Sequence, residues 1–131
     1  MLLAALLADP RRMKLKQSDG LWTRLLDIPA ALTGRRYALE GRLVFEVVDD
    51  FLPEVGGIFE LEGGPDGAGC RRSTATPELT LDIAGLSSRY LGDGSFRLLH
   101  QAGRATGAAD VIRRADQMFG WYQRPWCPHY F

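Results

Sequence analysis

The residues of this sequence that could do chemistry concentrate at its C-terminal end, where aromatic side chains accompany a free α-carboxylate. The segment 121–131 contains Trp126 and Tyr130 and ends in Phe131. An α-carboxylate has a pKa of about 3.5, so it is ionised at neutral pH and can accept a proton, and burial among rings would raise that pKa. A segment so rich in rings is expected to dock onto the fold rather than fray. The carboxylate of Phe131 then has two open roles, namely a salt bridge that pins the tail or a general base.

Cysteine and histidine provide no second site of comparable promise. The sequence has two cysteines and two histidines, and their spacing is unlike that of zinc ligands. Only Pro128 separates Cys127 from His129, a spacing that does not make a nucleophile and its base. His100 is interpreted as a residue at the surface or the edge of the core. A disulfide between Cys70 and Cys127 stays open.

Carboxylates gather over residues 49–54, at the end of an expected strand and the bend after it. They are interpreted as part of a solvated loop, and a cation site is the alternative. Asp27 comes just before Pro29 and is expected to cap the helix that begins there. Arg24 is expected to pair with an acid on a neighbouring strand, such as Glu46.

Composition excludes several classes of function. The 131 residues carry sixteen basic and sixteen acidic side chains, and the basic run over 10–16 is interpreted as one solvated strand face. A nucleic-acid partner or an anionic membrane surface is therefore not expected. No apolar run is long enough to span a bilayer, and the N-terminal residues do not form a signal peptide, so a cytoplasmic location is expected. The glycine-rich segments 63–69 and 103–107 lack the spacing and the lysine of a phosphate-binding loop, and they are interpreted as a flexible hairpin loop and a helix-ending turn, respectively.

The elements that would position these residues follow from hydrophobic periodicity and turn signals. The N-terminal part predicts a helix over 2–8, a hairpin over 12–27 and a helix over 29–36. The segment 42–49 is the strongest strand, and apolar side chains on both of its faces predict a central place in a sheet. Three further strands are expected over 58–62, 70–75 and 79–83.

Helical periodicity takes over in the C-terminal part of the chain. It predicts helices over 84–91, 95–102 and 108–119, with Ser95 as an N-cap and Gly120 as the end of the last helix. The expected buried face of that last helix consists of Val111, Ile112, Ala115, Met118 and Phe119. A mostly antiparallel sheet followed by helices indicates a single α+β domain.

Several segments, in this order, carry a family resemblance that covers nearly the whole chain. They are residues 7–11, 21–32, 35–37, 79–83, 90–92, 113–116 and 125–131. Together they resemble the C-terminal sterol-carrier-like domain of the enhanced intracellular survival (Eis-like) family of GNAT N-acetyltransferases. The resemblance implies a sterol-carrier-protein-like fold over 21–131, preceded by a linker helix and a first strand over 1–20.

The resemblance also implies an activity. In that family two N-terminal acetyltransferase domains bind the co-substrate acetyl-CoA, this domain binds no cofactor, and the enzymes assemble as homo-oligomers. The terminal carboxylate, here that of Phe131, serves as general base toward an amine on a small molecule or a peptide. Tyr130 and Trp126 would then line part of the substrate pocket. Because Tyr130 stands where some relatives would carry an acid, the choice between aminoglycosides and protein lysines stays open.

The sequence departs from the family in having no acetyltransferase portion. No segment has the long βα pattern or the pyrophosphate-binding turn of that fold, so the chain alone is expected to be inactive. Two alternatives are a stand-alone module that binds an apolar ligand and a domain that mediates assembly. The large side chains of Phe45, Phe59 and Trp22 could equally fill the cavity that a ligand would need.

Overall fold

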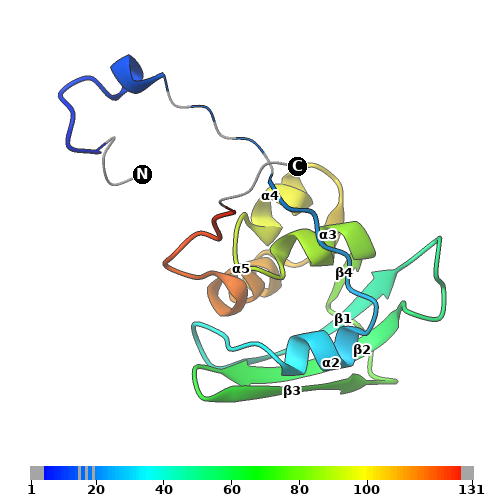
Figure 1. Cartoon of the computed structure of the whole chain (residues 1–131). Helices are drawn as coiled ribbons and strands as arrows, with labels where there is room; N and C mark the ends of the chain where they lie inside the picture. Colours follow the sequence, from blue (N-terminus) through cyan, green and yellow to red (C-terminus); the bar gives the residue numbers. More distant parts are fainter. Residues whose placement is uncertain (1–4, 15, 17, 19, 128–131) are drawn as a thin grey trace.

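A five-stranded sheet with helices packed on one side organises the chain (Figure 1). The computed structural model describes residues 5–14, 16, 18 and 20–127. The strand order is β3-β2-β1-β4-β5. Neighbouring strands are antiparallel except β1 and β4, which are parallel. The predicted α+β class with a mostly antiparallel sheet is confirmed. The bounds of the strands are β1 (Gly41–Val48), β2 (Gly57–Gly64), β3 (Gly67–Arg72), β4 (Leu79–Asp82) and β5 (Ala105–Gly107).

The central position predicted for the strongest strand is confirmed, because β1 lies between β2 and β4. Its residues Leu43, Phe45 and Val47 are buried on the face that the helices cover. Val44, on the opposite face, is buried as well. A strand with apolar residues on both faces is stable only where neighbours flank it, which explains the match.

The helices are α2 (Ile28–Thr33), α3 (Ile83–Arg89), α4 (Phe96–Gln101) and α5 (Ala109–Phe119), and a 3-10 helix η1 spans Pro10–Met13. Two of them, α2 and α4, begin at the capping residues that the sequence predicts. Asp27 caps α2 by accepting a hydrogen bond from the Ala30 amide at 3.0 Å. Ser95 caps α4 in the same way through the Leu98 amide. The five residues predicted for the buried face of α5 are all buried.

The hairpin predicted over 12–27 is wrong in the part of the chain that the structure describes. Residues 10–13 form η1, and residues 21–27 form no strand. The backbone of that segment bonds to a side chain instead of a ladder, since the Leu25 amide donates to Ser87 Oγ at 3.1 Å. The alternation of apolar and polar residues in 21–27 therefore does not mark a strand. The segment packs against the fold through one buried residue, Leu25, while Trp22 is 86% exposed. The helix predicted over 2–8 lies partly outside the described residues, and residues 6–8 are not helical.

Two glycine-rich segments also differ from prediction. Strands β2 and β3 continue through most of 63–69 and leave a tight turn at residues 65–66 in place of the expected flexible loop. The segment 103–107 does begin as a turn, but it then forms β5 against β4. Glycine permits a close approach of two backbones as well as a turn, so a glycine-rich segment does not by itself distinguish a strand from a turn.

The space between sheet and helices is filled by side chains of the chain itself. Phe45 and Phe59 are fully buried, as expected of residues that fill a cavity, but Trp22 is not. The internal space among the described residues near Phe96 and Phe119 is too small to admit a water molecule. A pocket for a lipid or a drug-sized ligand needs several hundred Å³.

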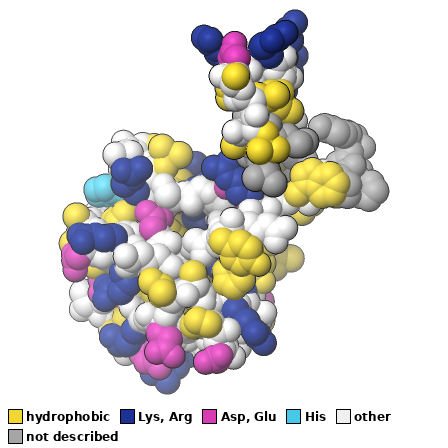
Figure 2. All heavy atoms as spheres, turned by 90° about the vertical axis from the view of Figure 1, so that its left-hand side faces the viewer, with side chains coloured by type: hydrophobic (Ala, Val, Ile, Leu, Met, Phe, Trp, Pro, Cys, Tyr) yellow, Lys and Arg dark blue, Asp and Glu magenta, His cyan; other side chains and the backbone are white. Residues whose placement is uncertain are grey.

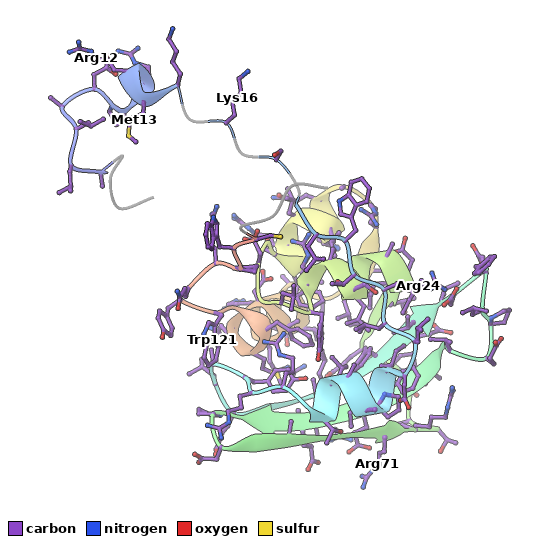
Figure 3. All side chains as sticks on the ribbon, viewed as in Figure 1. Arg12, Met13, Lys16, Arg24, Arg71 and Trp121 are labelled. Carbon is purple, nitrogen blue, oxygen red and sulfur yellow. The ribbon has the colours of Figure 1, made fainter. Side chains whose placement is uncertain are left out.

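The opposite face of the sheet is charged and open. Arg42 of β1, Glu60 of β2 and Arg71 of β3 form a cross-strand network, with Nε–Oε1 and Nη2–Oε1 distances of 2.9 and 3.3 Å. Figure 3 shows Arg71 pointing away from the helices. An open hollow of about 620 Å³ lies over this face, and its most buried carboxylate, Glu60, is already held by both arginines.

An ion pair joins the end of β1 to the N-terminal segment, and its acidic partner differs from the predicted one. Arg24 (Figure 3) bonds to Asp49 with an Nη2–Oδ2 distance of 2.5 Å, so the predicted pairing with an acid such as Glu46 is wrong. The side chain of Asp49 is 1% exposed, and its Oδ1 accepts from the amides of Phe51 and Leu52. Asp49 is therefore a loop-organising carboxylate and not part of a solvated loop.

The pKa of Asp49 makes its contribution to stability dependent on pH. Burial raises the pKa, but hydrogen bonds from the Leu52 amide, from Arg24 and from the Phe51 amide outweigh burial and lower it. A carboxyl whose pKa is lowered by folding stabilises the fold above its unfolded pKa and loses that contribution as the pH falls through its folded pKa. We expect Asp49→Asn to melt at a lower temperature than the wild type at pH 7, and the difference to shrink below about pH 3. Thermal unfolding followed by circular dichroism from pH 2 to 7 measures it.

The matched control is Asp50→Asn, since the neighbouring Asp50 is exposed. Its melting temperature should follow that of the wild type at every pH. A gap between Asp49→Asn and the wild type that is the same at pH 2 and pH 7 would contradict the role given to the charge of Asp49.

Candidate functional site

The C-terminal segment leaves the fold at the end of α5, and its aromatic residues are not docked in the part that the structure describes. Trp121 is 41% exposed, Tyr122 90% and Trp126 83%. The expected docking of the rings is therefore wrong for Tyr122 and Trp126, whereas Trp121 is partly covered. Phe96 and Phe119 already fill the core beside the point of departure, which leaves no place for further rings.

The start of the tail is held by Arg35, which lies in the loop after α2. Its guanidinium carbon is 4.6 Å from the ring centre of Tyr37 and 4.8 Å from that of Phe119. Its Nη1 donates to the Tyr90 carbonyl at 2.6 Å, and its Nη2 donates to the Phe119 carbonyl at 2.9 Å. One side chain thus joins the α2 loop, the end of α3 and the last residue of α5. We call this arrangement of Arg35, Tyr37, Tyr90 and Phe119 the arginine clamp.

The electrostatics of the arginine clamp fit a structural contact. Burial lowers the pKa of Arg35, and the neighbouring Tyr37 and Tyr90 raise it in part. Burial also raises the pKa of Tyr37, with Arg35 lowering it in part. The Tyr37 hydroxyl donates to the Leu32 carbonyl at 2.8 Å. At neutral pH the clamp therefore holds a guanidinium between a neutral phenol and a phenyl ring, an arrangement favoured by cation–π attraction.

Two contacts guide the tail beyond the clamp. Gly92 has a φ of 86°, and a β-carbon there would lie 3.0 Å from the Trp121 β-carbon, so the tail backbone packs closely on this glycine. Arg124 Nε lies 3.7 Å from Asp93 Oδ1. The rings of Trp121 and Tyr122 are 5.8 Å apart. Figure 3 shows Trp121 beside the end of α5.

The side on which the tail lies carries exposed apolar side chains. Figure 2 shows this side, with apolar groups gathered near its middle and charged groups around them. Leu91 adds to the exposed apolar surface next to Gly92, together with Trp121 and Tyr122.

The predicted site residues are only partly within reach of the structure. Phe131 and Tyr130 lie outside the described residues, as does His129, so the roles given to the first two stay predictions. Trp126 is described and exposes most of its ring. The arginine clamp was missed from the sequence, because Arg35 and Phe119 are far apart in the chain and a lone arginine after a helix carries no signal of its own.

The other reactive side chains do not form a site among the described residues. Cys70 is a free thiol on β3, and burial, followed by the nearby Asp27, raises its pKa to about 11. It is therefore protonated at neutral pH and a poor nucleophile. His100 places its Nδ1 2.9 Å from the Ala105 carbonyl oxygen and is exposed, which fits its interpretation as a residue at the surface or core edge.

No group of three histidine, cysteine or acidic side chains in the described ranges could hold a metal ion. None of the described helices is long and apolar enough to cross a membrane.

Comparison with known proteins identifies the fold and its usual setting. The sequence model of the sterol carrier protein domain matches residues 28–128. An uncharacterized N-acetyltransferase of Streptomyces griseus is 43% identical over 99% of this chain and 32% of its own length. The N-acetyltransferase Eis of Mycobacterium tuberculosis is 38% identical over 87% of the chain and 28% of its own length. The crystal structure of Eis1 from Mycobacterium abscessus superposes with a TM-score of 0.82 at 33% identity, over 98% of this chain and 33% of that one. The chain thus spans about a third of the curated relatives it matches.

Proposed function

Because the chain belongs to the sterol carrier protein domain family, in the form found in Eis-like N-acetyltransferases, we propose that it is the C-terminal domain of such an enzyme. The observation that carries the proposal is similarity along almost the whole chain to about a third of several N-acetyltransferases. The partners would be N-terminal acetyltransferase domains that bind acetyl-CoA, and residues 1–20 would link to them. The complete enzyme would be a cytoplasmic homo-oligomer.

The domain would supply the general base of the reaction. The Phe131 carboxylate would accept a proton from the substrate amine while the amine nitrogen attacks the acetyl carbonyl carbon. The new nitrogen–carbon bond forms as the carbon–sulfur bond breaks, and coenzyme A leaves as a thiolate that is then protonated. A carboxylate with an ordinary pKa of about 3.5 is a weak base, so it would work best where partial desolvation raises that pKa.

Aromatic residues of the tail would form part of the substrate wall. Trp126 presents an exposed ring, and an aromatic face attracts an ammonium group of an aminoglycoside or a lysine. Tyr130 would form part of the same substrate wall. The described part of the chain also supports this function over the carriage of an apolar ligand, since the core next to the sheet is filled.

Moving the terminal carboxylate tests the proposal. One glycine added after Phe131, in an acetyltransferase that carries this chain at its C-terminal end, should lower kcat at least tenfold, because general-base catalysis is worth about 10²–10⁴ in rate and water replaces part of it. The rate is measured by release of the coenzyme A thiol with acetyl-CoA and the aminoglycoside or lysine peptide that the wild-type enzyme acetylates fastest. The pH profile of kcat should lose its acidic limb.

The matched control is Phe131→Leu, which changes the ring and keeps the carboxylate where it was. It should retain most of kcat and the shape of the pH profile. An extended enzyme with an unchanged kcat and pH profile would refute the terminal-base function.

A further inference from the structure

We propose that Arg35 is a positioning residue for the terminal carboxylate, acting through the arginine clamp on the first residues of the tail. The inference rests on the function proposed above. It concerns a residue that lies in a loop far from the terminus in sequence and that the described structure places at the base of the tail.

The geometry of the clamp suits a guanidinium. Two of its nitrogens donate to two carbonyls on different elements, those of Tyr90 and Phe119. Its plane lies near two aromatic rings, and its Nε donates to the Arg36 carbonyl at 3.1 Å. A lysine ammonium is a point charge and cannot bridge two carbonyls while it stacks on a ring.

The clamp acts on the chain at the point where regular structure ends. The Phe119 carbonyl is the last of α5, and Gly120 continues with an extended backbone. The same guanidinium holds the Tyr90 carbonyl, two residues before the Gly92 on which Trp121 packs. Loss of Arg35 therefore loosens both the tail and the surface that guides it.

The consequence for the terminal carboxylate follows from the length of the tether. From Arg124 an extended chain reaches about 25 Å to the terminus, and from Phe119 it reaches about 40 Å. If the tail were a flexible tether, moving its point of attachment from Arg124 back to Phe119 would lower the effective concentration of the carboxylate only about twofold. A catalytic group displaced by 1 Å can cost about 10²-fold in rate. We expect an effect between these limits, about fivefold in kcat.

The test is a cycle of four enzymes, each with this chain at the C-terminal end of an acetyltransferase: the wild type, Arg35→Gln, the Phe131 extension by one glycine, and the double variant. Arg35→Gln alone should lower kcat about fivefold and leave the KM for acetyl-CoA unchanged. In the extended enzyme, whose carboxylate is already misplaced, Arg35→Gln should cause no further loss. Such non-additivity indicates that the two changes act on one group.

Two further variants keep the result interpretable. Arg36→Gln removes the same charge from the neighbouring exposed side chain and should leave kcat unchanged. Arg35→Lys keeps the charge and should fold even if Arg35→Gln does not, with a smaller loss of kcat that also disappears in the extended enzyme. Thermal unfolding of every variant separates loss of positioning from loss of folded protein.

The outcomes separate the two proposals. An Arg35 effect that is equally large in the extended enzyme, or no effect of Arg35→Gln and Arg35→Lys at all, overturns the positioning inference and leaves the terminal base in place. An extension that does not change kcat overturns the terminal base, and the inference falls with it.

Discussion

Replacing Phe119 by alanine is expected to lower the free energy of unfolding by about 3–5 kcal/mol, the usual cost of removing a buried phenylalanine ring. Phe119 is 3% exposed, and its ring meets those of Tyr37 and Phe96 edge to face at centroid distances of 5.2 and 5.0 Å. The guanidinium of Arg35 also lies over the Phe119 ring. Because these partners come from two separate parts of the fold, the loop after α2 and the α4 helix, they cannot all move into the space that the ring leaves. Urea denaturation of the wild type and the variant measures the difference.

Phe51→Ala is the matched control, because it removes the same side chain from a site where the ring is 81% exposed. The guanidinium of Arg24 lies 5.7 Å from the centre of the exposed Phe51 ring, so loss of this ring should cost less than about 1 kcal/mol. Equal losses in the two variants would contradict the packing described around Phe119.

The parts of the fold that were predicted correctly are those in which local sequence and burial agree. The α5 helix has apolar residues at helical spacing over three turns, so its buried face, including Met118, follows from the period alone. Strand β1 has apolar residues on both faces, and only a central strand satisfies such a pattern. Asp27 and Ser95 act through hydrogen bonds within three residues, which a sequence shows directly.

The parts that were not predicted depend on contacts between distant segments. Leu25 alternates with polar neighbours as in a strand, but the partner of its amide is Ser87, a side chain from another element. Asp49 was interpreted as solvated because nothing local indicates that Arg24 covers it. Trp126 was expected to dock, yet the core has no room left for it in the described structure. The general base at Phe131 came from family resemblance and stays a prediction.

Tyr37 links the filled core to the base of the tail. Its ring contacts Phe119 on one side and Arg35 on another, and its hydroxyl is held by the Leu32 carbonyl. The same residue thus belongs to the packed core and supports the arginine clamp.

Replacing Gly63 by alanine is expected to lower the free energy of unfolding by about 2–3 kcal/mol, at the upper end of the usual cost of overpacking. A β-carbon at Gly63 would lie 2.6 Å from Tyr37 Cδ2 and 3.0 Å from the Ala68 β-carbon. The Tyr37 ring cannot turn aside, because it is fully buried and its hydroxyl is bonded to the Leu32 carbonyl. The strain should therefore spread to the Phe119 ring and to the clamp, and it should be visible in urea denaturation.

Gly69→Ala separates this clash from the general effect of the substitution. Gly69 lies in β3, opposite Glu62, and a β-carbon there would meet no atom within 4 Å. An alanine at such a place restricts the unfolded chain and should raise the free energy of unfolding by about 0.4–1 kcal/mol. The two substitutions are thus expected to have opposite signs although they add the same methyl group to adjacent strands. If Gly63→Ala were also neutral or stabilising, Tyr37 would have to be free to move, and the arginine clamp could not hold the base of the tail as described.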